Sequence, residues 1–114
     1  MKPILITVLG VAAWSLTAGL ASAQDKAQIE RGMKVYAEQK CTVCHSIAGK
    51  GNAKGALDNV GAELKADEIH QWIVNAAEMS KKTKAERKPP MKSYSSLPKE
   101  DIDALVAYLQ TLKK

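Results

Sequence analysis

Two cysteines and a histidine lie within five consecutive residues, in the order Cys41-Thr42-Val43-Cys44-His45. If this segment forms one helical turn, both thiols are spaced so that a single rigid group can bridge them. The imidazole of the next residue then points at that group from the same side. The pattern ties the chain to whatever fills the centre of the fold, so it constrains the fold more than any other feature.

A Cys-x-x-Cys-His sequence predicts a c-type haem attachment site, in which the thiols of Cys41 and Cys44 add to the porphyrin vinyl groups and His45 binds the iron. Three other uses remain open. A thioredoxin-like redox pair needs a βαβ context, a zinc site needs about four ligands, and a structural disulfide suits an exported chain. The chain shows no strand alternation and has one further histidine, His70, so we favour haem attachment.

The first 23 residues have the pattern of a secretory signal peptide. Lys2 supplies a positive start, residues 4–20 are apolar with three hydroxyl side chains, and Ala21-Ser22-Ala23 is a small-x-small cleavage pattern. A retained membrane anchor is the alternative, but the apolar run is near the lower limit for a span. We expect cleavage after Ala23, a mature domain over residues 24–114 and a periplasmic location.

The mature domain has little apolar mass of its own. Among its 91 residues, 23 are Ile, Leu, Val, Met, Trp or Tyr, and none is Phe. Domains this small are marginal unless a disulfide, a metal or another cofactor stabilises them, and a disulfide between Cys41 and Cys44 would close only a tiny loop. The composition therefore favours a buried apolar cofactor.

The formal charge of +4 in the mature domain favours an acidic partner, and no basic stripe with interleaved aromatics suggests nucleic acid.

Three stretches have helical periodicity and none alternates like a strand, so the predicted class is all-α with one domain. They cover about residues 26–40, capped by Asp25 with Gln28, about residues 66–78, and about residue 98 to the C-terminus. Apolar stripes mark them: Ile29, Gly32, Met33 and Tyr36; Ile69, Trp72, Ile73 and Ala76; and Ile102, Leu105, Val106, Leu109 and Leu112. A glycine-rich loop over residues 46–61 and a basic, proline-containing loop over residues 80–97 separate them.

A haem iron held by one imidazole needs a second axial ligand or an open site. Four residues have a suitable lone pair: His70, Met33, Met79 and Met91. We expect Met33 to pack in the core, because it belongs to the first apolar stripe. Met91 follows Pro89 and Pro90, which restrict the backbone and can hold a sulfur at a fixed height. We predict His45 and Met91 as metal ligands, with Met79 the next candidate.

The mature chain resembles the class I cytochrome c family over nearly its whole length. The resembling elements are Gly32-x-x-x-Tyr36, Cys41-x-x-Cys44-His45, the glycines up to Leu57 and Gly61, Pro89-Pro90-Met91 with Tyr94, and residues 102–109. The resemblance implies an all-α cytochrome c fold, with three main helices and loops around one covalent haem c. It also implies that the first and last helices cross at Gly32 beside Tyr36 and Tyr108, and that Trp72 bonds a haem propionate.

One position departs from the family pattern. The family often has a proline after the glycine equivalent to Gly55, whose carbonyl oxygen holds the proximal imidazole, and here that position is Ala56. The carbonyl needed for a hydrogen bond to His45 is retained, but the stiffening ring is not.

These features predict a periplasmic monohaem electron carrier with redox protein partners, soluble after cleavage and able to dock to a membrane complex. We expect no enzyme activity, because no nucleophile, acid–base pair or oxyanion hole lies near the motif. A basic rim around the haem edge would steer an acidic docking surface, with a solvated loop as the alternative. This rim consists of Lys81, Lys82, Lys84, Arg87, Lys88 and Lys92. Other functions left open are a subunit of a respiratory or dehydrogenase complex, a haem enzyme or gas sensor with an open sixth position, and a disulfide-bonded binding module.

Overall fold

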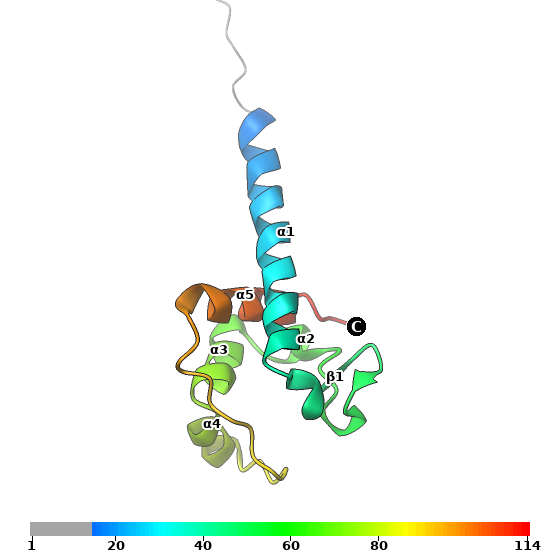
Figure 1. The fold of residues 1–114 in the computed structure, drawn as a ribbon, viewed down its shortest axis with the longest axis vertical. Helices are drawn as coiled ribbons and strands as arrows, with labels where there is room; N and C mark the ends of the chain where they lie inside the picture. Colours follow the sequence, from blue (N-terminus) through cyan, green and yellow to red (C-terminus); the bar gives the residue numbers. More distant parts are fainter. Residues whose placement is uncertain (1–14) are drawn as a thin grey trace, which may run out of the picture.

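The computed structural model describes residues 15–114, with side chains from Asp25 onward. Its elements are α1 (Ser15–Glu38), the 3-10 turn η1 (Cys41–Val43), β1 (Ser46–Ile47), β2 (Lys50–Gly51), the 3-10 turn η2 (Ala53–Gly55), α2 (Val60–Glu63), α3 (Ala66–Val74), α4 (Ala76–Thr83) and α5 (Lys99–Gln110). The predicted helical class is confirmed, and the β structure of the described part is limited to the two-residue strands and an isolated bridge between Ser46 and Ala56. The N-terminal part of α1 projects from the domain, and the other elements gather around its C-terminal part (Figure 1).

Helices α1 and α5 pack against each other more extensively than any other pair of elements in the described residues. Gly32 is buried where they cross, and a Cβ atom there would overlap the carbonyl oxygen of Ala104 and lie 2.6 Å from the Cβ atom of Tyr108. The rings of Tyr36 and Tyr108 meet edge to face, with their centroids 6.0 Å apart. The predicted crossing at Gly32 is therefore confirmed, because only a residue without a side chain permits this approach.

The hydrophobic core joins one face each of α1, α3 and α5. Its buried members are Val35, Tyr36, Ile69, Ile73, Ile102, Leu105, Val106 and Leu109. The predicted core position of Met33 is wrong, since its side chain is 50% exposed. Gly32, Val35 and Tyr36 set the buried face of α1 at helical spacing, and Met33 lies about 100° around the helix from Gly32.

The predicted start of the first helix is also wrong. Asp25 lies inside α1, which continues upstream to Ser15, so Asp25 and Gln28 do not cap it. No proline interrupts the chain from Ser15 to Glu38, so nothing in the covalent structure stops the helix there. Residues 1–14 of the predicted signal peptide lie outside the described residues, and the expected cleavage pattern lies within α1.

The stretch predicted as one helix over residues 66–78 is two helices, because the backbone leaves the helical conformation at Asn75. The carbonyl oxygen of Ile73, which would continue the helix, accepts a hydrogen bond of 2.7 Å from the N–H of Tyr94. This bond also ties the loop that follows Met91 to the end of α3. The last helix ends at Gln110, so Lys113 and Lys114 lie beyond its final turn.

The loop after the Cys-x-x-Cys-His motif contains a small hairpin and a short helix that the sequence analysis did not predict. Strands β1 and β2 pair antiparallel through a turn at Ala48 and Gly49, both with positive φ. Helix α2 lies against the end of α5, where the N–H of Gly61 donates to the carbonyl oxygen of Leu112 at 2.9 Å. None of the helices within residues 15–114 combines the length and apolar character needed to cross a membrane.

Replacing Gly32 with alanine should lower the free energy of unfolding by about 1–3 kcal/mol, because the new methyl group meets backbone atoms of α5 that cannot rotate away. Chemical denaturation of the haem-loaded protein measures this change. The exposed Lys34→Ala variant of the same helix serves as the control and should stay within about 0.5 kcal/mol. An unchanged or higher stability for Gly32→Ala would contradict the close approach of α1 and α5.

Candidate functional site

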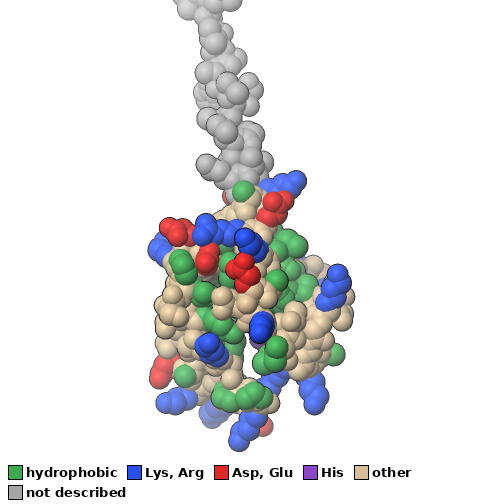
Figure 2. All heavy atoms as spheres, viewed as in Figure 1, with side chains coloured by type: hydrophobic (Ala, Val, Ile, Leu, Met, Phe, Trp, Pro, Cys, Tyr) green, Lys and Arg blue, Asp and Glu red, His purple; other side chains and the backbone are tan. Residues whose placement is uncertain are grey.

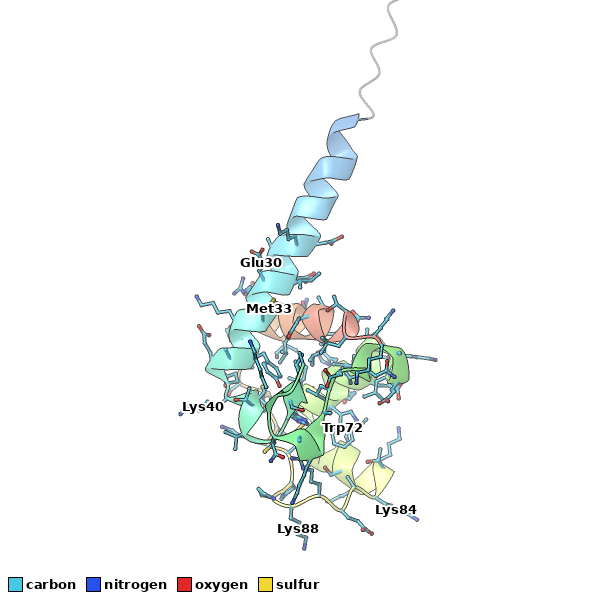
Figure 3. All side chains as sticks on the ribbon, turned by 90° about the vertical axis from the view of Figure 1, so that its right-hand side faces the viewer. Glu30, Met33, Lys40, Trp72, Lys84 and Lys88 are labelled. Atoms are coloured by element: carbon cyan, nitrogen blue, oxygen red, sulfur yellow. The ribbon has the colours of Figure 1, made fainter. Side chains whose placement is uncertain are left out.

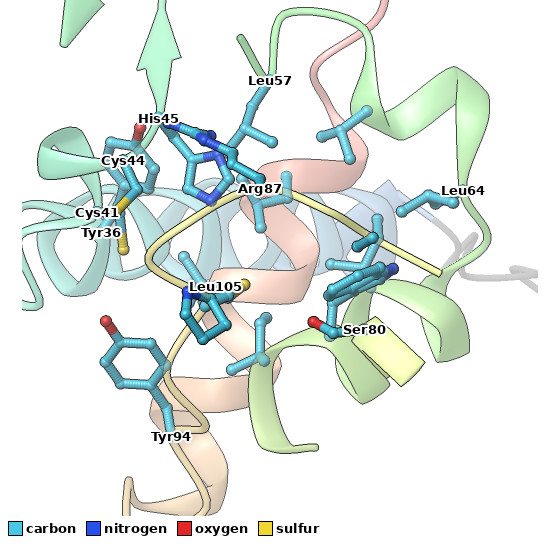
Figure 4. A pocket seen from close by; sticks show the side chains of 18 of the residues that line it. Tyr36, Cys41, Cys44, His45, Leu57, Leu64, Ser80, Arg87, Tyr94 and Leu105 are labelled. Carbon is cyan, nitrogen blue, oxygen red and sulfur yellow. The ribbon is translucent and has the colours of Figure 1, made fainter. Parts of the chain in front are cut away.

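An apolar cavity of about 490 Å³ lies between the helical core and two loops (Figure 4). Its size falls in the range of small-molecule and cofactor sites. Core side chains of α3 and α5 form one wall, and residues of α1, α2 and α4 and the loops around residues 41–57 and 85–94 complete the lining. The apolar lining residues include Leu57, Leu64, Ile69, Ile73, Leu105 and Leu109.

The Cys-x-x-Cys-His motif forms the single turn that its spacing predicts. The N–H groups of Cys44 and His45 both donate to the carbonyl oxygen of Cys41, at 3.1 and 2.9 Å. Both cysteines are half-buried free thiols, and burial raises the pKa of Cys41 to about 11, so this thiol stays protonated at neutral pH. Cys41, Cys44 and His45 all line the cavity.

The imidazole of His45 is held by a hydrogen bond between its Nδ1 and the carbonyl oxygen of Gly55, at 2.9 Å. A carbonyl oxygen only accepts, so Nδ1 carries the proton and Nε2 keeps its lone pair. Burial lowers the pKa of His45 and outweighs the hydrogen bond to Gly55, which raises it, and the nearby charge of Arg87 adds to the lowering. The ring is therefore neutral and oriented, as a metal-binding imidazole must be.

Hydrogen bonds fix the Gly55 carbonyl without a proline at position 56. Ala56 has φ −59° and ψ 129°, which a proline would also adopt. On either side, the N–H of Leu57 donates to the carbonyl oxygen of Ser46 at 2.8 Å, and the N–H of Gly55 donates to that of Asn52 at 3.1 Å. The bond from His45 to Gly55 that the resemblance implied is thus present.

The four candidates for a second axial ligand are not equally placed. Met91 lines the cavity, whereas Met79 and His70 are absent from its lining. Met33 is on the exposed side of α1. The loop carrying Met91 is anchored three residues later, where Tyr94 bonds to α3 and its ring faces the cavity.

Two residues reach the cavity in roles that the sequence analysis did not assign. The hydroxyl of Tyr36, expected only as a packing group, is buried and has no hydrogen-bond partner within the described residues. Burial raises the pKa of Tyr36 to about 12, so this hydroxyl is a neutral donor. Arg87, expected on the rim, also lines the cavity. No sequence pattern signals either role, because both depend on the direction of a side chain.

The residues present fit a covalently held haem. Largely apolar walls suit a porphyrin, two thiols lie next to a neutral imidazole, and the unpaired Tyr36 hydroxyl leaves a donor available to a bound group. Trp72 also lines the cavity, and its hydrogen bond to a haem propionate stays a prediction.

Residues 29–113 match the cytochrome c family, so the chain belongs to this family. It is a cytochrome c domain that carries electrons with covalently attached haem c, and Cys41 and Cys44 are consistent with that attachment. The chain is similar to cytochrome c oxidase subunit 2 of Alkalihalophilus pseudofirmus, with 29% identity over 92 residues. The match covers 73% of this chain and 25% of that protein, so the chain spans about a quarter of the relative's length. No solved structure matches the chain significantly.

Proposed function

We propose that this chain is an exported monohaem electron carrier in which Cys41 and Cys44 hold the haem and His45 and Met91 bind its iron. The observation that carries this proposal is the shared lining of one apolar cavity by all four residues. The exposure of Met33 and the absence of Met79 and His70 from the lining support Met91 as the second ligand.

When bound, the haem supplies a centre that takes up and releases one electron. The protein holds that centre in a fixed position and excludes water from it. The carbonyl oxygen of Gly55 orients the imidazole of His45, and the bond from Tyr94 to Ile73 holds the chain beyond Met91. Fixed ligands need little rearrangement between oxidation states, which suits a carrier.

Export through a signal peptide is part of this proposal. The pattern of residues 1–23 supports cleavage after Ala23, which leaves a domain that begins at Gln24 and functions in the periplasm. The cysteine pair fits the same compartment, because thioether bonds keep the haem attached outside the cell.

The partner is a redox protein with an acidic docking surface. The basic segment over residues 81–92 is exposed next to the cavity, and Figure 2 shows several of the protein's Lys and Arg side chains at the end opposite the projecting part of α1. In Figure 3, Lys84 and Lys88 point away from the domain. Such a surface speeds encounter with an acidic protein and allows rapid release.

The similarity to a cytochrome c oxidase subunit favours a second candidate function. In this alternative, the domain works as a fixed part of, or a docked donor to, a membrane oxidase. Co-purification with an oxidase from native membranes would support it, and recovery only as a free protein in the periplasmic fraction would exclude a fixed subunit.

Protein exported where haem-attachment machinery is present should carry the mass of one haem after acid denaturation and should begin at Gln24. Intact mass spectrometry with an absorption spectrum measures both. A Cys41→Ala/Cys44→Ala variant is the control and should lose covalent haem. A folded, colourless wild-type product would contradict the proposed function, and a start at Met1 would contradict the cleavage alone.

Met91→Ala should keep the covalent haem but open the iron to added ligands, because the second axial sulfur is gone. Carbon monoxide binding to the reduced protein, followed by absorption, should become rapid in Met91→Ala and stay slow in the wild type. Met33→Ala removes an equal side chain outside the cavity and should behave like the wild type. Rapid binding by the wild type would favour an enzyme or gas sensor, and slow binding by Met91→Ala would move the ligand to Met79 or His70.

Neutralising the basic segment should slow reaction with an anionic oxidant. The Lys82→Gln/Lys88→Gln variant should react with ferricyanide about threefold more slowly than the wild type at low salt, and the difference should vanish at high salt. A cationic cobalt phenanthroline oxidant should show no such slowing. Lys113→Gln/Lys114→Gln makes the same charge change at the C-terminus, and an equal effect there would argue against a local docking surface.

A further inference from the structure

Arg87 is set apart from the other cations of the basic segment by its position. It is the one Lys or Arg among the cavity-lining residues described, whereas the neighbouring lysines are absent from the lining. Its guanidinium lies against Gly55, such that a Cβ atom at that glycine would overlap Nη1 and lie 3.0 Å from Cζ. Figure 4 shows the guanidinium beside the ring of His45.

The guanidinium of Arg87 has no carboxylate partner in the described part of the chain. None of the ion pairs or side-chain hydrogen bonds found there includes it, although Glu63 also lines the cavity. An unpaired guanidinium that lines an apolar cavity is placed to pair with an anion carried by whatever fills that cavity. Because Arg87 as a whole is exposed, such an anion would lie at the mouth of the cavity.

Haem brings its own anions, since it carries two propionate carboxylates. The planar guanidinium matches a carboxylate with two parallel hydrogen bonds, which a lysine cannot make. We propose that Arg87 pairs with a haem propionate and raises the reduction potential of the haem, instead of serving the docking surface. This inference rests on the proposed function, because it needs the haem to occupy the cavity.

The direction of the effect follows from charge. A cation beside the haem stabilises the reduced state, which is less positive by one unit than the oxidised state. Loss of that cation favours oxidation, and partial exposure of Arg87 limits the size of the change.

A spectroelectrochemical titration of the Arg87→Gln variant tests this role. At a fixed electrode potential and low ionic strength, the ratio of reduced to oxidised protein should fall about threefold to tenfold, a drop of up to about 59 mV. Lys88→Gln makes the same charge change at the next residue and should alter the ratio less than twofold. Equal shifts in Arg87→Gln and Lys88→Gln would overturn the proposal.

A second pair of variants keeps the test valid if Arg87→Gln yields no folded protein. Arg87→Lys and Lys88→Arg both preserve charge, and redox-induced infrared difference spectra with ¹³C-labelled propionates report on the carboxylate bonds. The propionate band should move in Arg87→Lys and stay in place in Lys88→Arg. An unmoved band in Arg87→Lys would overturn the pairing, while intact mass and slow carbon monoxide binding would still support the proposed carrier.

Discussion

The close packing of α1 on α5 at Gly32 is the contact on which the rest of the structure depends. It brings the turn of Cys41, Cys44 and His45, which follows α1 directly, next to the apolar face of α5. That face continues into the cavity, so Leu105 and Leu109 serve the core and the site together. A small domain thereby uses one set of side chains for stability and for cofactor binding, which fits its scarcity of large apolar residues.

Local patterns in the sequence were enough to predict the class and the turn at the motif, and the resemblance to the cytochrome c family implied the crossing at Gly32. Features set by distant partners were not predictable. The break in the helix at Asn75 depends on a hydrogen bond between Tyr94 and Ile73, which are 21 positions apart. No local sequence pattern indicates this bond. Periodicity alone placed Met33 in the core because it cannot tell which of two adjacent helical faces is buried.

The candidate site shows the same difference between features with a local sequence signal and features set by the fold. Residue types and spacing predict Cys41, Cys44 and His45 as site residues, and the prolines favour Met91, before any coordinates are known. The sequence shows that Arg87 is charged but not where its side chain points, so Arg87 was grouped with the lysines of the basic segment. In the structure its guanidinium turns inward over Gly55. The unpaired hydroxyl of Tyr36 is likewise visible only once the fold encloses it.

The backbone at Ala56 has a consequence for how such chains diverge. Its φ of −59° already suits a pyrrolidine ring, and its N–H has no hydrogen-bond acceptor within the described residues. Alanine and proline codons differ by a single base. Relatives can therefore exchange these two residues in one mutational step without displacing the proximal imidazole. The pyrrolidine ring of proline adds stability mainly by reducing the conformational entropy of the unfolded chain.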